Sequence, residues 1–193
     1  MKKIPLICFF TVLIIHGSWS FEWSLGFLSD NPGINGRSLS RPLPLRDGNE
    51  FTIHIKSETS VYCYVIARDS ENSVHVLNNS VLEKDQELLI GPLEITPPSG
   101  QELFYVVMSG IPQRALENFI RLFEMNTGSP KAAEDLMGEI LKIRRDISQL
   151  REGPEIPVAM GGSFRGEDPS LSGTSGVRYS GTDCYVKSVT IRH

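Results

Sequence analysis

Two short runs in the middle of the chain are apolar or aromatic at every position, and they constrain the fold more than any other feature. They are residues 61–66 and residues 103–108. A strand with one wet face alternates apolar and polar residues, whereas a strand covered on both faces is apolar throughout. We therefore expect these two segments to be neighbouring strands of a sheet that is packed on both sides.

Two other segments show the alternation of half-buried strands. Residues 51–56 alternate between apolar and polar side chains, and residues 74–76 resume an alternation after the polar segment 68–73. A polar loop between two strand-like runs is typical of a hairpin. Residues 61–66 and 74–76 are therefore predicted to pair antiparallel.

Four further segments complete the predicted strands. Residues 23–28 are predicted to form a short strand, and residues 184–191 a strand that returns to the sheet and closes the fold. Two prolines limit residues 39–45 to an edge strand or an extended arm. A Gly-Pro pair within residues 88–95 predicts a bent or bulged edge strand.

Residues 112–151 are predicted to form two consecutive helices, because apolar residues recur there every three or four positions. Gly128 separates the helices, and Ser129 followed by Pro130 is a typical helix start. The apolar stripe of the second helix consists of Leu136, Ile140, Ile143, Ile147 and Leu150. This stripe is either core or, where it is wider than one domain buries, an interaction or dimerisation face.

The composition changes to glycine, serine and proline in residues 153–182, which predicts a long loop that is either a lid or a linker. The whole pattern predicts an α+β fold: an antiparallel β-sheet or small β-sandwich, two consecutive helices packed on one face, and a closing C-terminal strand. The expected single domain is residues 21–193, with a β-rich core over residues 45–112.

The first 20 residues have the pattern of a secretory signal peptide. Lys2 and Lys3 precede an apolar run over residues 4–15, and small residues at positions 18 and 20 precede Phe21. The apolar run is shorter than the ~20 residues that a membrane-spanning helix needs. We therefore expect cleavage after Ser20, a periplasmic or secreted protein, and no membrane span in the mature chain.

The charge balance argues against a nucleic-acid partner. The chain has 19 Lys and Arg against 23 Asp and Glu, a net charge of −4, and loss of Lys2 and Lys3 with the signal peptide makes it more negative. Nucleic acids bind to basic surfaces, because their phosphates must be neutralised.

Two cysteines remain after the predicted cleavage, Cys63 and Cys184. An exported protein can keep a disulfide, and this one would close a loop of ~120 residues. The alternative is that each cysteine is a small buried apolar residue. The sequence leaves both readings open.

Residues 45–112 resemble an uncharacterised bacterial family, domain of unknown function 4384, which occurs in exported and envelope-associated proteins. The matching segments are residues 47–48, 61–65, 73–78, 93–97 and 100–107. Asn72 stands where that family has a hairpin glycine, and Asn78 where it tends to have a proline. The resemblance implies a β-rich module of an envelope protein, without established catalytic residues.

No stretch of the chain carries a chemically specific motif. His54, His75 and His193 lack the short spacing of a zinc site, and His54 is expected to be solvated on the polar face of its strand. Residues 161–166 resemble a nucleophile elbow, but the closing glycine comes one residue late. We therefore predict no catalytic residue, no metal site and no cofactor.

Four aromatic residues, Tyr62, Tyr64, Phe104 and Tyr105, fall on the two fully apolar strands. They either line a ligand groove for a sugar or a peptide, or form the core beneath the helices. Core is the favoured alternative, because the apolar stripe of the first helix must pack against something.

These observations predict a non-enzymatic exported module of a cell envelope, which binds an envelope protein or a surface polymer. The sequence leaves open whether the chain forms homo-oligomers. One alternative is a secreted hydrolase with a site assembled from residues distant in sequence. Another is a subunit of a surface or secretion assembly.

Overall fold

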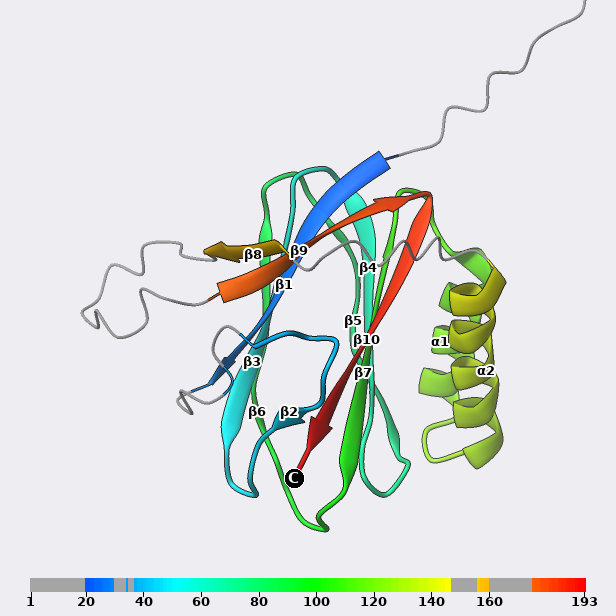
Figure 1. The fold of residues 1–193 in the computed structure, drawn as a ribbon. Coiled ribbons are helices and arrows are strands. Elements are labelled where there is room, and N and C mark those ends of the chain that lie inside the picture. Colours follow the sequence, from blue (N-terminus) through cyan, green and yellow to red (C-terminus); the bar gives the residue numbers. More distant parts are fainter. Residues whose placement is uncertain (1–19, 30–33, 35–36, 147–155, 160–174) are drawn as a thin grey trace, which may run out of the picture.

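The computed structural model describes residues 20–29, 34, 37–146, 156–159 and 175–193. Within these ranges the chain forms two five-stranded β-sheets that face each other, with two helices on the outer side of the second sheet (Figure 1). This is the predicted α+β fold with a small β-sandwich. None of the helices in the described ranges is long and apolar enough to cross a bilayer.

The first sheet has the order β6-β3-β1-β9-β8 and is antiparallel throughout. Its strands are β1 (Ser20–Ser29), β3 (Glu50–Ser57), β6 (Glu87–Glu94), β8 (Ile156–Ala159) and β9 (Ser175–Thr182). The segment expected to be a short strand over 23–28 is therefore the ten-residue central strand β1. Its alternate residues Phe21, Trp23, Leu25 and Phe27 are buried in the core between the sheets.

The second sheet has the order β2-β10-β7-β4-β5. Its strands are β2 (Leu43–Pro44), β4 (Val61–Arg68), β5 (Val74–Leu82), β7 (Gln101–Ser109) and β10 (Cys184–Arg192). All its pairs are antiparallel except β2 with β10, which are parallel. The predicted hairpin is confirmed as β4–β5, the proline-containing arm lies at the sheet edge as β2, and the closing strand is an inner strand.

The second sheet is packed on both faces, as its two fully apolar strands predict. Val65 and Val106 pack in the core between the sheets, whereas their chain neighbours Ile66 and Val107 pack in a second core beneath the helices. The helices are α1 (Arg114–Met125) and α2 (Pro130–Asp146). The predicted N-cap of α2 is confirmed, because the Ala132 N–H donates to the Ser129 hydroxyl at 3.3 Å.

The structure differs from the predicted loop over residues 153–182, because this range contains β8 and β9. Val177 and Tyr179 of β9 alternate into the core and are buried, although glycine, serine and arginine surround them in sequence. A Cβ atom on Gly181 would lie 2.7 Å from the ring of Phe21. This glycine therefore permits close packing and does not mark a loop. Residues 153–155 and 160–174 of the predicted loop lie outside the described ranges.

Two irregular positions, the bulge beside β6 and the hairpin residue Asn72, agree with what the sequence predicts. β6 is an edge strand, and its register with β3 shifts between Phe51 and Ile53, beside Gly91. Asn72 occupies the hairpin position expected of glycine and has φ of 68°. Asparagine tolerates this left-handed conformation better than most residues do.

Candidate functional site

The two cysteines cannot form the disulfide considered from the sequence, and both are free. Cys63 pairs with Met108 of β7, whereas Cys184 pairs with the next residue, Ser109. Successive residues of a strand point to opposite faces, so Cys63 lies in the core between the sheets and Cys184 in the core beneath the helices. They are also two strands apart, ~10 Å, beyond the ~7 Å limit for a disulfide. Each is a buried apolar residue.

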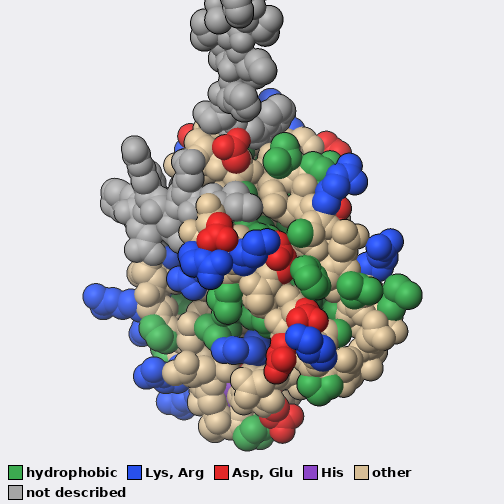
Figure 2. Space-filling view, turned by 90° about the vertical axis from the view of Figure 1, so that its right-hand side faces the viewer, with side chains coloured by type: hydrophobic (Ala, Val, Ile, Leu, Met, Phe, Trp, Pro, Cys, Tyr) green, Lys and Arg blue, Asp and Glu red, His purple; other side chains and the backbone are tan. Residues whose placement is uncertain are grey.

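The predicted interaction face of the second helix is core where the structure describes it. Leu136, Ile140 and Ile143 are at most 1% exposed and pack against the second sheet, while Ile147 and Leu150 lie outside the described ranges. The exposed large apolar side chains on the two helices are Leu122, Met125 and Leu141. Figure 2 shows the helical side of the molecule, where apolar side chains are separated by polar and charged ones.

The four aromatic residues do not line one groove. Tyr64 and Tyr105 are buried beneath the helices with Leu116 and Ile120, and Tyr62 packs at the edge of that cluster. Phe104 faces the opposite side of the sheet, toward the core between the sheets. Because successive side chains of a strand point to opposite faces of the sheet, Phe104 is separated from the three tyrosines. The structure therefore supports the alternative that these residues form the core.

The expectation that His54 is solvated is wrong, because its side chain is 5% exposed. It lies opposite Gly26, which has no side chain, and its Nε2 is 3.4 Å from a carboxylate oxygen of Glu87. Burial lowers the pKa of His54 from its ordinary 6.5, and the Glu87 carboxylate opposes this shift. The ring is therefore favoured in its neutral form.

His193, directly after β10, contacts one residue in the turn before β3 and one at the start of β7. Its ring is fully buried, with Nδ1 2.9 Å from Asp47 Oδ1 and Nε2 3.8 Å from Glu102 Oε1. Burial raises the pKa of Glu102. Over the described part of the chain, no three His, Cys, Asp or Glu side chains are grouped so that they could hold a metal ion.

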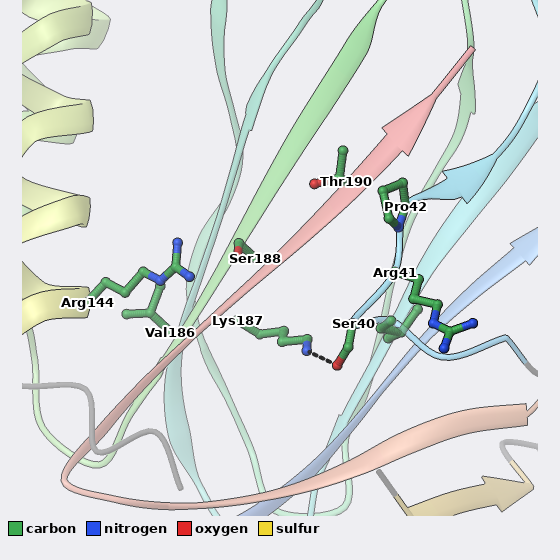
Figure 3. A pocket seen from close by; sticks show the side chains of 9 residues that line it. Ser40, Arg41, Pro42, Arg144, Val186, Lys187, Ser188 and Thr190 are labelled. Atoms are coloured by element: carbon green, nitrogen blue, oxygen red, sulfur yellow. Dashed lines mark hydrogen bonds between the residues drawn. The ribbon is translucent and has the colours of Figure 1, made fainter. Parts of the chain in front are cut away.

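The strongest candidate for a binding site is a cavity of about 220 Å³ beside β10, which we call the β10 groove (Figure 3). It is formed by the arm that leads into β2, by β10 and by one residue of α2. The lining residues are Leu39, Ser40, Arg41, Pro42, Arg144, Val186, Lys187, Ser188 and Thr190.

Three cationic side chains lie around the β10 groove. Arg144 lies on the helical side of β10, whereas Lys187 and Arg41 lie on the other side (Figure 3). In the ranges that the structure describes, the guanidinium groups of Arg41 and Arg144 take part in no ion pair or hydrogen bond. Both arginines are exposed.

Lys187 is the most constrained of the three cations. It is 5% exposed, its Nζ lies 3.4 Å from the Ser40 hydroxyl, and it lies 5.2 Å from the centre of the Tyr179 ring. A lysine over an aromatic face is stabilised by the ring electrons. The Lys187 side chain is therefore held in place between the arm and β9.

The chemistry of the β10 groove suits an anionic group. The two exposed arginines attract carboxylate or phosphate oxygens, and the Ser188 and Thr190 side chains add hydroxyl groups. The cavity is smaller than the ~300–1,000 Å³ of typical sites for drug-sized ligands. It therefore fits one or two acidic groups of a larger partner.

Sequence reasoning missed this site, because its cations come from three separate parts of the chain. Arg41, Arg144 and Lys187 are brought together only by the pairing of β2 with β10 and by the packing of α2. One local signal was present: Lys187 falls in the inward register of its strand, between Tyr185 and Val189, which are both buried.

Comparison of the chain with protein-family models, with curated proteins and with solved structures found no match.

Proposed function

We propose that the protein is a non-enzymatic, exported module of a cell envelope, and that it binds an anionic envelope component in the β10 groove. The observation that carries the proposal is the pair of exposed arginines, Arg41 and Arg144, which flank one cavity in a chain of net charge −4. Exposed arginines that flank a cavity of an acidic protein favour an anionic ligand.

The exported location is supported by the signal-peptide pattern of residues 1–20 and by the resemblance of residues 45–112 to domain of unknown function 4384. The partner is an envelope protein or a surface polymer with carboxylate or phosphate groups. Cell fractionation and mass spectrometry of the N-terminus test the location. We expect a periplasmic or secreted chain that begins at Phe21; a cytoplasmic chain that keeps residues 1–20 would contradict it.

Binding is tested with two anions of different chemistry, poly-glutamate and sodium polyphosphate, by isothermal titration at low salt. We expect at least one to bind, with an affinity that falls as the salt concentration rises, because the contacts are electrostatic. The double variant Arg41→Gln/Arg144→Gln is expected to weaken binding at least tenfold, equal to about 1.4 kcal/mol.

The matched control is Arg121→Gln, which removes an exposed arginine that donates to Asn118 on α1. It should bind like the unchanged protein. Binding of neither anion, or equal loss in the control and the double variant, would overturn the proposal. Crosslinking in intact cells followed by mass spectrometry then identifies the partner, and crosslinks are expected near Arg41 and Arg144.

A further inference from the structure

β5 differs from the other strands at the sheet edges. In the described ranges, the edge strands of the two sheets are β6, β8, β2 and β5. β2 and β8 have two and four residues and each contains a proline, and β6 contains Pro92 and a glutamate at each end. Short strands, prolines and charged side chains stop an edge from pairing with another strand. β5 has nine residues, no proline, and no Asp, Glu, Lys or Arg.

The second half of β5 is regular and open to solvent. The register of β5 with β4 shifts once, and residues 78–82 then pair with β4 in regular order. Asn79, Ser80 and Val81 are exposed. The Asn78 amide donates to a carbonyl of β4, and the Ser80 hydroxyl donates to Asn78. Because β5 is the last strand in its sheet, no strand in the described part of the chain pairs with its outer edge.

The sequence of this segment favours a second copy of the chain as its partner. An antiparallel pair of identical strands has a two-fold axis, so the central residue faces its own copy. In residues 78–82 the central residue is Ser80, and Asn79 faces Val81 of the other copy. Like charges directly opposite each other destabilise a strand pair, and this pairing places none there. Two copies of a chain of net charge −4 can therefore approach here without local repulsion.

The outer edge of β5 is separate from the β10 groove. β7 and β4 lie between β10 and β5 in the order of the second sheet. Contact between two copies through β5 would therefore leave one β10 groove accessible at each end of the pair.

We propose that two copies of the chain form a dimer by pairing their β5 strands antiparallel about Ser80, which joins their second sheets into one continuous sheet. This goes beyond the proposed function and does not depend on it. A dimer of this kind holds two β10 grooves, so a partner with several anionic groups would be bound at two points.

Analytical ultracentrifugation of the protein as isolated from cells tests the dimer, from micromolar to millimolar concentration. We expect a monomer–dimer equilibrium that shifts to monomer on dilution. Ser80→Glu should raise the dissociation constant of the dimer at least tenfold, because two carboxylates would lie opposite each other at the axis. Ser99→Glu is the matched control, since it adds the same charge at an exposed serine in the turn before β7. It should leave the dissociation constant unchanged.

A charge-swap experiment tests the position of the axis. Ser80→Lys alone should also weaken the dimer, because two ammonium groups would then face each other. An equimolar mixture of Ser80→Glu and Ser80→Lys should form dimers again, because opposite charges meet at the axis. Recovery in the mixture also shows that both variants are folded.

Each contrary result would overturn the proposal. A chain that stays monomeric at millimolar concentration does not pair through β5. A dimer that Ser80→Glu leaves intact, or that Ser99→Glu weakens equally, does not use this edge. A mixture of the two charged variants that stays monomeric would show that Ser80 does not face its own copy. None of these results bears on the anionic ligand, which the titrations with poly-glutamate and polyphosphate test.

Discussion

The hydroxyl of Tyr64 donates to Glu117 at 2.8 Å and accepts the N–H of Gln113 at 3.1 Å. One residue of β4 thus binds both the start of α1 and a carboxylate in its first turn. Burial raises the pKa of Tyr64, so the hydroxyl keeps its proton for Glu117. Because Gln113 precedes the first turn of α1, this side chain fixes where the helix begins on the sheet.

Tyr64→Phe should lower the free energy of unfolding by about 1–2 kcal/mol, because it leaves a partly buried N–H and a carboxylate without their partner. Urea unfolding measures the change. Tyr62→Phe is the matched control on the same face of β4; its hydroxyl forms no hydrogen bond within the described ranges, so the change should stay within about 0.5 kcal/mol. Equal effects in the two variants would contradict the assignment.

The thiols of Cys63 and Cys184 should be unreactive in the folded protein. Burial raises their pKa values, to about 12 for Cys63 and about 11 for Cys184, and the thiolate is the reactive form. In a Cys8→Ser chain, a thiol reagent at pH 8 should modify neither cysteine until denaturant is added, and then both. The same sample should unfold at the same urea concentration with and without a reducing agent. A reductant-dependent midpoint would show that a disulfide forms.

His54 should make stability fall as the solution is acidified. Its pKa in the folded protein lies below 6.5, so the unfolded chain binds this proton more readily than the folded one. The free energy of unfolding should therefore decrease as the pH drops below about 6.5. Nuclear magnetic resonance titration of the ring measures the pKa directly.

The same titration, repeated on a Glu87 variant, tests whether Glu87 raises the pKa of His54. Because the Glu87 carboxylate raises the pKa of His54 against the effect of burial, Glu87→Gln should lower this pKa further. Glu83→Gln removes an exposed acid from the turn before β6 and serves as the control. An unchanged His54 pKa in Glu87→Gln would mean that the two side chains do not interact, and a rise would contradict the direction of the effect.

Two glycine-to-alanine changes should have opposite effects. Gly91 has φ of 139°, and an added Cβ would lie 2.9 Å from the Phe51 carbonyl oxygen, so Gly91→Ala should cost about 1–3 kcal/mol. Gly138 lies on the exposed side of α2 with open space around it, so Gly138→Ala should stabilise by about 0.5–1 kcal/mol. Thermal unfolding of both variants checks the signs, and a neutral result at position 91 would contradict the close approach.

The layers of the fold could be predicted because the apolar pattern of a single segment indicates how many of its faces are buried. The unbroken apolar runs in β4 and β7 require cover on two sides, and the helix stripe supplies one of the covers. β9 escaped prediction because Val177 and Tyr179 stand among glycine and serine, a composition typical of loops. Their burial depends on β1, which is more than 140 residues away in the sequence and lies beside β9 in the sheet.

The candidate site was beyond sequence reasoning for a related reason. A basic site needs several cations in one place, and Arg41, Arg144 and Lys187 have neither a shared period nor a shared segment. The aromatic residues, by contrast, are adjacent in the sequence but separated by strand alternation. Nearness in sequence was misleading for Phe104 and Tyr105, whereas the pairing of β2 with β10 and the packing of α2 bring the cations together.

The strand order also decides when the protein can fold. In the first sheet, β1 pairs with β9, and in the second sheet, β10 lies between β2 and β7. Each sheet therefore lacks an inner strand until β9 and β10 have been synthesised. Pairing of such distant segments makes folding slow. A growing chain therefore cannot complete either sheet before β9 and β10 have been added, and the strands made earlier must wait for these late partners.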